Sequence, residues 1–545
     1  MRNPNKKLLF ILLFSAFFLI AVFLFSLSSV EMRLSDISLS PTAFHNLMDE
    51  RTQTDHFSDP ILMINGYKLA YDQASKTFFY SVVQDDAFKY DPLVSVRGLS
   101  AGNRFAFQKA EFSDEAMRNN TKYPFIIYSE KQYMQYYLTL TNLPVVRIEA
   151  NNAIENEDIR YSERISVSFT LFDNRSNLSS QQRLSKSDAS MHIRGGTSRT
   201  YPKKSFRVSL SHRSPGGNNR NNHLSLLGMR TDDDWILYAA YDDPHKVRNV
   251  FSSTLWTDMS AGNNQFGIIN GTWGEYIELF INDRYWGVYA LMYPVDIKQL
   301  ELIETSDVLT NDYHYRAYDN QPDMTYDMFF SASEGSLYGK YELYFPKTSI
   351  SDWRRWKPLS DFLYVLSLDK DEFLEHYPES VDINNVIDLQ IFLMASLAID
   401  NDAKNIDIVA KYNGREHVML FSPWDLDITW GRGFSTSVVL SPSHQFLPVS
   451  FGMSQALDLR IPGFVEQLQS RYKTLRSSWL SNQSLLSRLD LYEKSIFGSG
   501  AIVRDKERWP QAASAESMDD LAAYIVKRME YMDDFIASLG QGGKE

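Results

Sequence analysis

Several short segments of the chain alternate between apolar and polar positions, and this period of two predicts β-strands. In residues 205–210, Phe206, Val208 and Leu210 fall on one face and polar side chains fall on the other. A glycine-containing segment precedes them and follows another predicted strand that ends near Arg194. The pattern therefore predicts a strand, a loop and a strand over residues 191–210, with Lys204 on the apolar face.

Two apolar runs, residues 406–410 and 418–421, flank Asn413 and Gly414. Asn-Gly between apolar runs favours a hairpin with a type I′ turn, because both central positions of that turn have positive φ. Such a hairpin returns residues 424–427 to the vicinity of Asp400, which precedes the first run. One end of a sheet is thus predicted to gather acidic side chains that are distant in sequence.

The remaining pattern is mixed, and the predicted fold class is α+β. Hairpins are predicted at Asn65-Gly66 and at Asn282-Asp283. A helix with Asp243 as its cap and Pro244 at its first position is expected to continue to about Met259. Further helices are predicted over residues 353–368, 383–398 and 517–539. Residues 300–350 and 430–455 show no clear period and are predicted to form loops.

Residues 8–30 contain no charged side chain and are dominated by Leu, Phe and Ile. This length suffices to cross a bilayer core of roughly 30 Å. Lys6 and Lys7 precede the segment and Glu31 follows it, so the positive-inside rule places the N-terminus in the cytoplasm. The expected localisation is a single-pass protein of the cell membrane whose main part is extracytoplasmic. A cleaved signal peptide is the alternative, although Ser-Leu-Ser-Ser fits a cleavage site poorly.

Composition narrows the choice of function. The 545 residues predict more than one domain, and three regions are expected: 1–30 as cytoplasmic tip and membrane anchor, 31–140 as a β-rich accessory region, and 141–540 as the main domain with C-terminal helices. The net charge of −13 argues against a nucleic-acid partner. The chain has no cysteine, which excludes disulfides and thiolate metal sites.

The acidic end of the 406–421 hairpin is the first candidate for chemistry. Asp400 is followed five residues later by Asn405, and the second strand leads to Asp425 and Asp427. Phosphoryl transfer needs one carboxylate to orient the acceptor hydroxyl, and an Asn and an Asp to hold Mg²⁺. The order resembles a protein-kinase catalytic loop followed by its metal-binding Asp, although the flanking letters differ. A solvated acidic turn is the alternative.

The loop between the two strands of residues 191–210 is the second candidate. A lysine aimed inward, as predicted for Lys204, needs an anionic partner. A nucleotide phosphate would serve, and the segment Gly195-Gly196-Thr197-Ser198 could offer backbone N–H groups to the same phosphates. The predicted cofactor-binding residues are Lys204, Arg194, Gly195, Gly196 and Ser198. The alternative is that the ammonium of Lys204 extends to solvent at a sheet edge.

Two further features leave the interpretation open. The run from Asp232 to Asp234 is predicted to be a solvated turn before a buried strand, with a metal site as the alternative. The helix after Asp243 contains no Glu that could pair with Lys204 as in ordinary protein kinases. Asp242, Glu275 and Glu278 are weak substitutes.

Four segments together resemble the CotH kinase family, named for spore-coat protein H and built on an atypical protein-kinase fold. They are IRGGTSRTYPKKSF, LLGMRTDDDWILYAAYDDPHKVRN, YIELFINDRYWGVYAL and IDNDAKN…FSPWDLDITWG. They occur in the family's order and spread over roughly residues 140–540.

The resemblance implies an ATP- and Mg²⁺-dependent kinase that phosphorylates Ser or Thr of surface or envelope proteins. It assigns Asp400 as catalytic base, with Asp402 as the alternative, and Lys204 as phosphate contact, with Lys203 as the alternative. Asn405 and Asp425 are implied metal ligands, and Asp427 is a further one. Two other functions stay open: a pseudokinase that serves as a surface-assembly or binding module, and a kinase acting on a cell-envelope glycan.

Overall fold

The computed structural model describes residues 31–84, 90–109, 111–150, 164–213, 219–317, 337–338, 340–347, 352–402, 404–435 and 438–539. Helices and sheets are mixed throughout these ranges, which confirms the α+β class. The predicted membrane segment, residues 8–30, lies outside them. Among the described helices, none combines the length and the apolar character that crossing a bilayer requires.

The N-terminal part, up to Thr141, consists of two small sheets around an aromatic core. The ring centroids of Phe107 and Phe125 are 4.7 Å apart, and those of Phe125 and Tyr136 are 5.4 Å apart. One sheet has the order β1 (Met32–Arg33), β8 (Leu93–Arg97), β4 (Ile61–Ile64), β5 (Tyr67–Lys68). The other has the order β2 (Ser38–Leu39), β9 (Arg104–Gln108), β10 (Tyr123–Tyr128), β11 (Gln132–Thr141), β7 (Thr77–Ser81), β6 (Ala70–Asp72), and β3 (Thr52–Gln53) pairs with β11. Two short helices accompany them, α2 (Pro41–Asp49) and α3 (Asp114–Arg118).

The next sheet closes on itself, because β14 pairs with both β13 and β15. Its interior is filled by large apolar side chains such as Ile193, Phe206, Trp235 and Leu279. β12 and β20 run parallel, whereas the other paired neighbours are antiparallel. We refer to this closed sheet as the barrel. Its strands are β12 (Val145–Ala150), β13 (Ile165–Phe172), β14 (Leu184–Arg194), β15 (Ser205–Arg213), β19 (Asp234–Tyr238), β20 (Gly274–Ile281) and β21 (Arg284–Met292), and β16 (Asn219–Asn221) extends β15.

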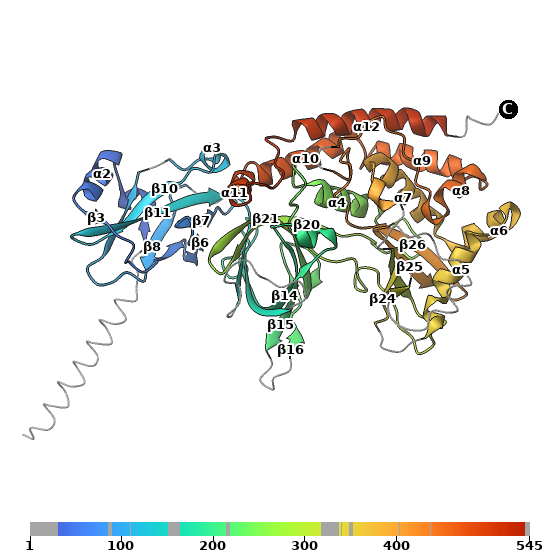
Figure 1. Cartoon of the computed structure of the whole chain (residues 1–545), viewed down its shortest axis with the longest axis horizontal. Helices are drawn as coiled ribbons and strands as arrows, with labels where there is room; N and C mark the ends of the chain where they lie inside the picture. Colours follow the sequence, from blue (N-terminus) through green and yellow to red (C-terminus); the bar gives the residue numbers. More distant parts are fainter. Residues whose placement is uncertain are drawn as a thin grey trace, which may run out of the picture.

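The C-terminal part contains a further sheet, which has five strands and is surrounded by helices (Figure 1). Its order is β23 (Leu337–Tyr338), β24 (Tyr341–Phe345), β22 (Tyr313–Ala317), β25 (Ile406–Tyr412), β26 (His417–Pro423). The helices are α4 (Arg248–Ser260), α5 (Lys357–Val365), α6 (Lys370–Ser380), α7 (Ile383–Ser396), α8 (Met453–Asp458), α9 (Phe464–Arg476), α10 (Asn482–Ile496), α11 (Ala501–Arg508) and α12 (Asp519–Ser538). One continuous apolar core joins α4, α7, α9, α10 and α12 to this sheet.

Helix α11 lies where the N-terminal part meets the barrel, although it belongs to the C-terminal region of the chain (Figure 1). Arg504 donates hydrogen bonds to the Asn120 side chain and to the Leu140 carbonyl, and it pairs with the buried Glu278 of β20. Glu278 also accepts hydrogen bonds from Thr141 and Tyr285. The end of the chain therefore fastens its first part to the barrel.

Two local predictions were wrong in detail. Helix α4 begins at Arg248 rather than at Pro244, because Lys246 has φ 62° and interrupts a right-handed helix. The Asp243 side chain still accepts a hydrogen bond from the Arg248 N–H at 2.8 Å. Part of the predicted loop over residues 300–350 forms strands β22, β23 and β24. Residues 318–336, 339 and 348–350 of that prediction lie outside the described residues.

The hairpin of β25 and β26 is confirmed, but its turn is not type I′. Only Gly414 has positive φ, and four residues separate the paired Tyr412 and His417. The Asn413 side-chain oxygen accepts from the N–H groups of Arg415 and Glu416 at 2.9 and 3.0 Å, which stabilises the longer turn. By contrast, the turns at Asn65-Gly66 and Asn282-Asp283 have positive φ at both central residues, as a type I′ turn requires.

Candidate functional site

The hairpin returns its second strand to the segment that contains Asp400. The Trp424 N–H donates to the Asn405 carbonyl at 2.8 Å. The Asn401 side-chain amide donates to the carbonyls of Asn405 and Trp424 at 3.0 and 2.7 Å. These bonds join residues 399–405 to residues 424–427, so Asp400, Asn405, Asp425 and Asp427 occupy one end of the sheet. We call these four residues the acidic end.

The backbone around the acidic end is strained. Leu397, Asn405, Asp425 and Trp430 all have φ between 51° and 58°, a region that non-glycine residues rarely adopt. Such conformations cost of order 1–3 kcal/mol each and cluster at functional sites. Their concentration around the predicted site residues favours a functional role for this end of the sheet.

Asp400 is held between an amide and an ammonium group. Its Oδ2 accepts from the Asn405 side-chain amide at 2.8 Å, and its Oδ1 lies 3.1 Å from the Lys404 Nζ. Burial raises the pKa of Asp400, the Lys404 charge opposes that rise, and the charge of Asp425 adds to it. Asp402, the alternative base, instead accepts from the backbone N–H groups of Val449 and Ser450.

Asp427 and Asp242 are two carboxylates that bind the same arginine, Arg432. Burial and the neighbouring charge of Asp425 raise the pKa of Asp427 to about 8, against the opposing charge of Arg432. The Arg432 NH1 donates to Asp427 Oδ2 at 2.8 Å, and its other terminal nitrogen binds Asp242. The Tyr201 hydroxyl donates to the same Asp242 at 2.9 Å. Through this chain of contacts, the loop between β14 and β15 is connected to the acidic end.

Arg194, at the end of β14, approaches the acidic end directly. Its guanidinium carbon lies 5.5 Å from the centre of the Trp424 ring. Burial lowers the pKa of Arg194, and the charge of Asp425 opposes that shift. Arg316 lies over the same ring at 4.9 Å, but its guanidinium is bound to Asp407. Arg194 thus places a cation beside the glycine-containing loop, within electrostatic reach of Asp425.

The predicted orientation of Lys204 was wrong. β15 begins only at Ser205, so the strand alternation does not extend to Lys204. The Lys204 side chain is half-buried, and its Nζ donates to the Arg199 carbonyl at 2.7 Å. The neighbouring Lys203 is the buried lysine. Its Nζ donates to the Asp505 carboxylate of α11 at 2.6 Å and to the Val288 carbonyl at 2.7 Å.

A glycine makes this buried lysine–aspartate pair possible. Gly287 has φ 117°, and a Cβ at this position would lie 2.3 Å from Asp505 Oδ1 and 3.2 Å from the Lys203 Cε. A side chain at residue 287 would therefore displace Asp505 from Lys203.

The other loop residues have well-defined positions. Gly195 has φ 113°, and a Cβ there would lie 2.1 Å from the Ser198 hydroxyl oxygen. Gly196 is exposed, and its carbonyl accepts from the Arg199 N–H at 3.2 Å. Ser198 lies in the short helical turn Thr197–Thr200, and its carbonyl accepts a hydrogen bond from the Tyr201 N–H at 3.2 Å. Whether these groups bind nucleotide stays a prediction.

The donors of the acidic end match the chemistry of Mg²⁺, which prefers oxygen ligands. The charge of Asp425 raises the pKa values of Asp400 and Asp427, and a divalent cation would relieve that repulsion. In the described residues, however, no three acidic or histidine side chains converge as a ready metal site. Asn405 and Asp427 would have to exchange their present partners, Asp400 and Arg432, for the ion.

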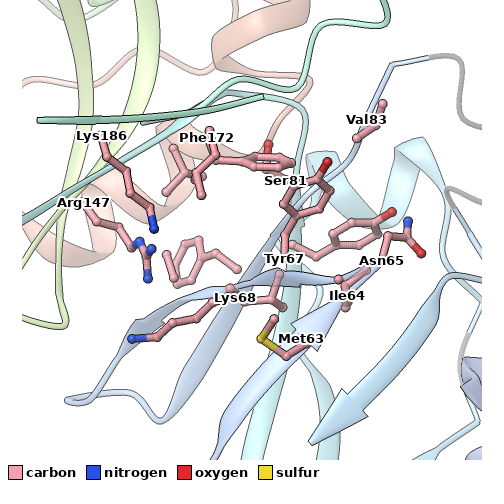
Figure 2. A pocket seen from close by; sticks show the side chains of 17 residues that line it. Met63, Ile64, Asn65, Tyr67, Lys68, Ser81, Val83, Arg147, Phe172 and Lys186 are labelled. Atoms are coloured by element: carbon pink, nitrogen blue, oxygen red, sulfur yellow. The ribbon is translucent and has the colours of Figure 1, made fainter. Parts of the chain in front are cut away.

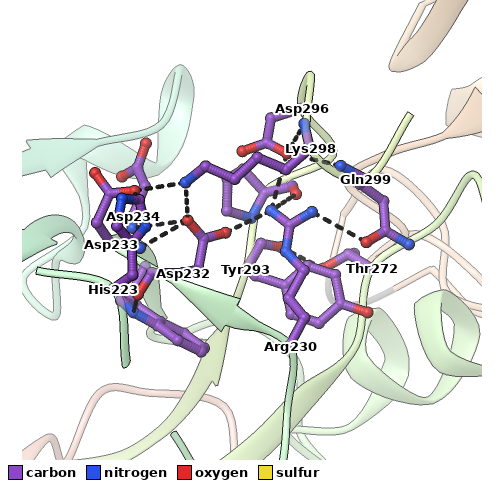
Figure 3. A network of polar contacts seen from close by, with 12 residues as sticks. His223, Arg230, Asp232, Asp233, Asp234, Thr272, Tyr293, Asp296, Lys298 and Gln299 are labelled. Carbon is purple, nitrogen blue, oxygen red and sulfur yellow. Dashed lines mark hydrogen bonds and ion pairs between the residues drawn. The ribbon is translucent and has the colours of Figure 1, made fainter. Parts of the chain in front are cut away.

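The run Asp232–Asp234 is neither a solvated turn nor an open metal site. Asp232 and Asp233 are only 0% and 8% exposed. Figure 3 shows the ammonium of Lys298 between these two carboxylates, and Arg230 bound to Asp232 and Asp296. Cationic side chains therefore occupy the positions that a metal ion would need.

Sequence reasoning missed three cations: Lys404, Arg316 and Arg432. Lys404 follows Asp400 by four residues and Arg432 follows Asp427 by five, so the spacing could have suggested both pairs. Arg316 gave no such signal, because its partner Asp407 is 91 residues away.

Two comparisons with known proteins bear on this site. The family model described as CotH kinase protein matches residues 191–532, which include the β14–β15 loop, the acidic end and α11. A search of curated proteins gives no match to the chain.

Proposed function

The chain belongs to the CotH kinase family, and on this premise we propose that it is a membrane-anchored kinase with an atypical protein-kinase fold. It would act outside the cytoplasm and transfer the γ-phosphoryl group of ATP to Ser or Thr hydroxyls of surface or envelope proteins. The observation that carries this proposal is the meeting of Arg194 with the acidic end across the Trp424 ring. A cation and a set of oxygen donors at one place are what binding of a metal–nucleotide complex requires.

In the proposed reaction, the acidic end has two tasks: Asp400 acts on the acceptor hydroxyl, and the other three residues hold the metal ion. Asp400 orients the acceptor hydroxyl and takes its proton, and the raised pKa of this buried carboxyl suits a general base better than an exposed one. Asn405, Asp425 and Asp427 would hold Mg²⁺, which neutralises charge on the phosphates when bound. Arg194 would contact phosphate oxygens, for which a planar guanidinium is well suited.

The catalytic test is the substitution Asp425→Asn, followed by Mg²⁺-dependent transfer of labelled phosphate from ATP. Asn tolerates the left-handed backbone at this position, where φ is 58°, so the charge is removed with little added strain. We expect a loss of labelling of at least about 100-fold. The matched control is Asp283→Asn, which changes an exposed residue of equal type with φ 53° in the β20–β21 turn. Undiminished labelling by Asp425→Asn would disprove the assignment.

A pseudokinase is the second candidate, and one observation favours it. Asn405 is bound to Asp400, Asp427 is bound to Arg432, and Lys203 is bound to Asp505, so several polar groups near the loop already have protein partners. Calorimetry with ATP and Mg²⁺ separates the two candidates. A pseudokinase that serves as an assembly module would give neither Mg²⁺-dependent nucleotide binding nor labelling of protein or glycan acceptors.

A further inference from the structure

A cavity of about 270 Å³ lies between the N-terminal part and the outer face of the barrel (Figure 2), and none of its lining residues belongs to the acidic end. The hairpin of β4 and β5 forms one wall, together with Phe79, Tyr80 and Ser81 around the end of β7. Strands β12, β13 and β14 form the other wall with Val145, Phe172 and Leu184. This volume is slightly below the usual range for small-molecule sites, about 300–1,000 Å³.

The barrel wall of the cavity follows from strand alternation. Val146 and Ile148 point into the barrel core, so Val145 and Arg147 point outward. In the register, Arg147 lies opposite Thr170, and Thr170 lies opposite Lys186. Arg147 and Lys186 are thus on one row across three strands, and Figure 2 shows their charged ends converging at the same end of the cavity. Lys68 of β5 lines the cavity from the opposite wall.

These three cations have no anionic partner among the described residues. Among the described residues, the side chains of Lys68, Arg147 and Lys186 make no hydrogen bond or ion pair, and no described residue that lines the cavity is acidic. Burial lowers the pKa of Arg147, against the opposing charges of Glu149 and Asp283. The chain has a net charge of −13, yet all the charged residues that line the described part of this cavity are cations. Arg147 is half-buried, whereas Lys68 and Lys186 are exposed, so an anion from solvent can reach all three cations.

Most of the remaining lining is apolar, although Asn65 and Ser81 also contribute to it. Met63, Leu69 and Ala70 face it from the N-terminal part, and Val145 and Phe172 face it from the barrel. Tyr67 packs edge-on against Phe172 with their ring centroids 4.9 Å apart, and this contact holds the hairpin against the barrel. A ligand in this position would touch both parts of the protein.

We propose that this cavity binds a small single-chain amphiphile with an anionic head, a carboxylate or a phosphate. The head contacts Arg147, Lys186 and Lys68, and the apolar body lies between the β4–β5 hairpin and Phe172. Because the ligand contacts both walls, its binding strengthens the attachment of the N-terminal part to the barrel.

The test uses decanoate as the probe and isothermal titration calorimetry on the purified protein. We expect decanoate to bind, and decanol and inorganic phosphate to bind at least tenfold more weakly, since each lacks one half of the recognised chemistry. Arg147→Met and Lys186→Met each raise the dissociation constant for decanoate at least tenfold. Lys109→Met, which removes an equal charge from an exposed position of the N-terminal part, leaves it unchanged.

Decyl phosphate, whose chain has the same number of carbons as decanoate, distinguishes the two head groups: tighter binding than decanoate assigns a phosphate head, and weaker binding assigns a carboxylate. Lys186 is exposed, so its variant separates loss of binding from loss of folding. The proposal is overturned if decanoate does not bind, if it binds equally to the wild type and to Lys186→Met, or if inorganic phosphate binds as tightly as decanoate.

Discussion

Removing the buried ammonium of Lys203 should destabilise the protein far more than removing that of its neighbour. Lys203 and Asp505 are 0% and 1% exposed, and their charged atoms are 2.6 Å apart. The substitution Lys203→Met leaves the Asp505 carboxylate buried without its closest partner. Breaking a buried pair in this way typically costs about 3–5 kcal/mol. Because Lys246 lies 3.8 Å from the same carboxylate, we expect the lower end of that range.

The corresponding change in melting temperature follows from the size of the unfolding unit. Unfolding entropy is about 2.1 cal/mol/K per residue, or roughly 0.7 kcal/mol/K for the residues in the family match. A loss of about 3 kcal/mol therefore lowers the melting temperature by roughly 4 °C. Lys204→Met is the matched control: it removes a hydrogen bond of about 1 kcal/mol, which lowers the melting temperature by less than about 2 °C.

Scanning calorimetry or fluorimetry measures both variants, and a third variant tests the cause. In the wild type, the Val288 N–H donates to Asp505 Oδ1 at 3.1 Å. Asp505→Asn keeps an oxygen that can accept this hydrogen bond, and it removes the negative charge. Combined with Lys203→Met, it should restore part of the lost stability, since no unpaired charge remains at this position. Equal melting temperatures for Lys203→Met and Lys204→Met, or a further loss in the double variant, would refute the reasoning.

Two further predictions concern titration and nucleotide binding. Burial raises the pKa of Glu275 to about 7 from 4.5, so the folded state holds a proton that the unfolded state releases, and stability falls as the pH rises between those values. Glu275→Gln should therefore raise the free energy of unfolding by at most about 3 kcal/mol at pH 8 but not below pH 4.5; a gain that is the same in denaturant titrations at both pH values contradicts this. Arg194→Met should weaken Mg²⁺–ATP binding at least tenfold in calorimetry, whereas Arg199→Met, an exposed change in the same loop, should not. Equal affinities of these two variants would remove Arg194 from the proposed site.

Local sequence signals predicted the elements that carry the acidic end. Apolar periodicity predicted the strands on either side of Gly195, and Asn413-Gly414 predicted the hairpin of β25 and β26. These signals depend on residues close together in the chain, as do turn geometry and side-chain alternation. The same information placed Asp400 and Asp425 at one end of a sheet.

Interactions between distant segments could not be predicted in the same way. The orientation of Lys203 depends on Asp505, which is 302 residues away and belongs to α11. Alternation also fails where a strand has not yet begun, and one such residue is Lys204. The run Asp232–Asp234 appeared solvated because its partners, Arg230 and Lys298, gave no periodic signal. Each of these errors concerns a charged side chain whose partner is supplied by tertiary structure.

The lysine–aspartate pair also limits which cation can serve the proposed phosphotransfer. Lys203 contacts Asp505 and the Val288 carbonyl, and releasing its ammonium to a nucleotide would leave a buried carboxylate without its closest partner. Among its described contacts, the Arg194 side chain forms no ion pair that nucleotide binding would break, and the charge of Asp425 acts on its guanidinium. A guanidinium stays protonated when buried and binds phosphate through two parallel hydrogen bonds, whereas a buried ammonium loses its proton more readily. Arg194 is therefore the better phosphate contact on physical grounds, and the role of Lys203 is to hold α11, and with it the N-terminal part, against the barrel.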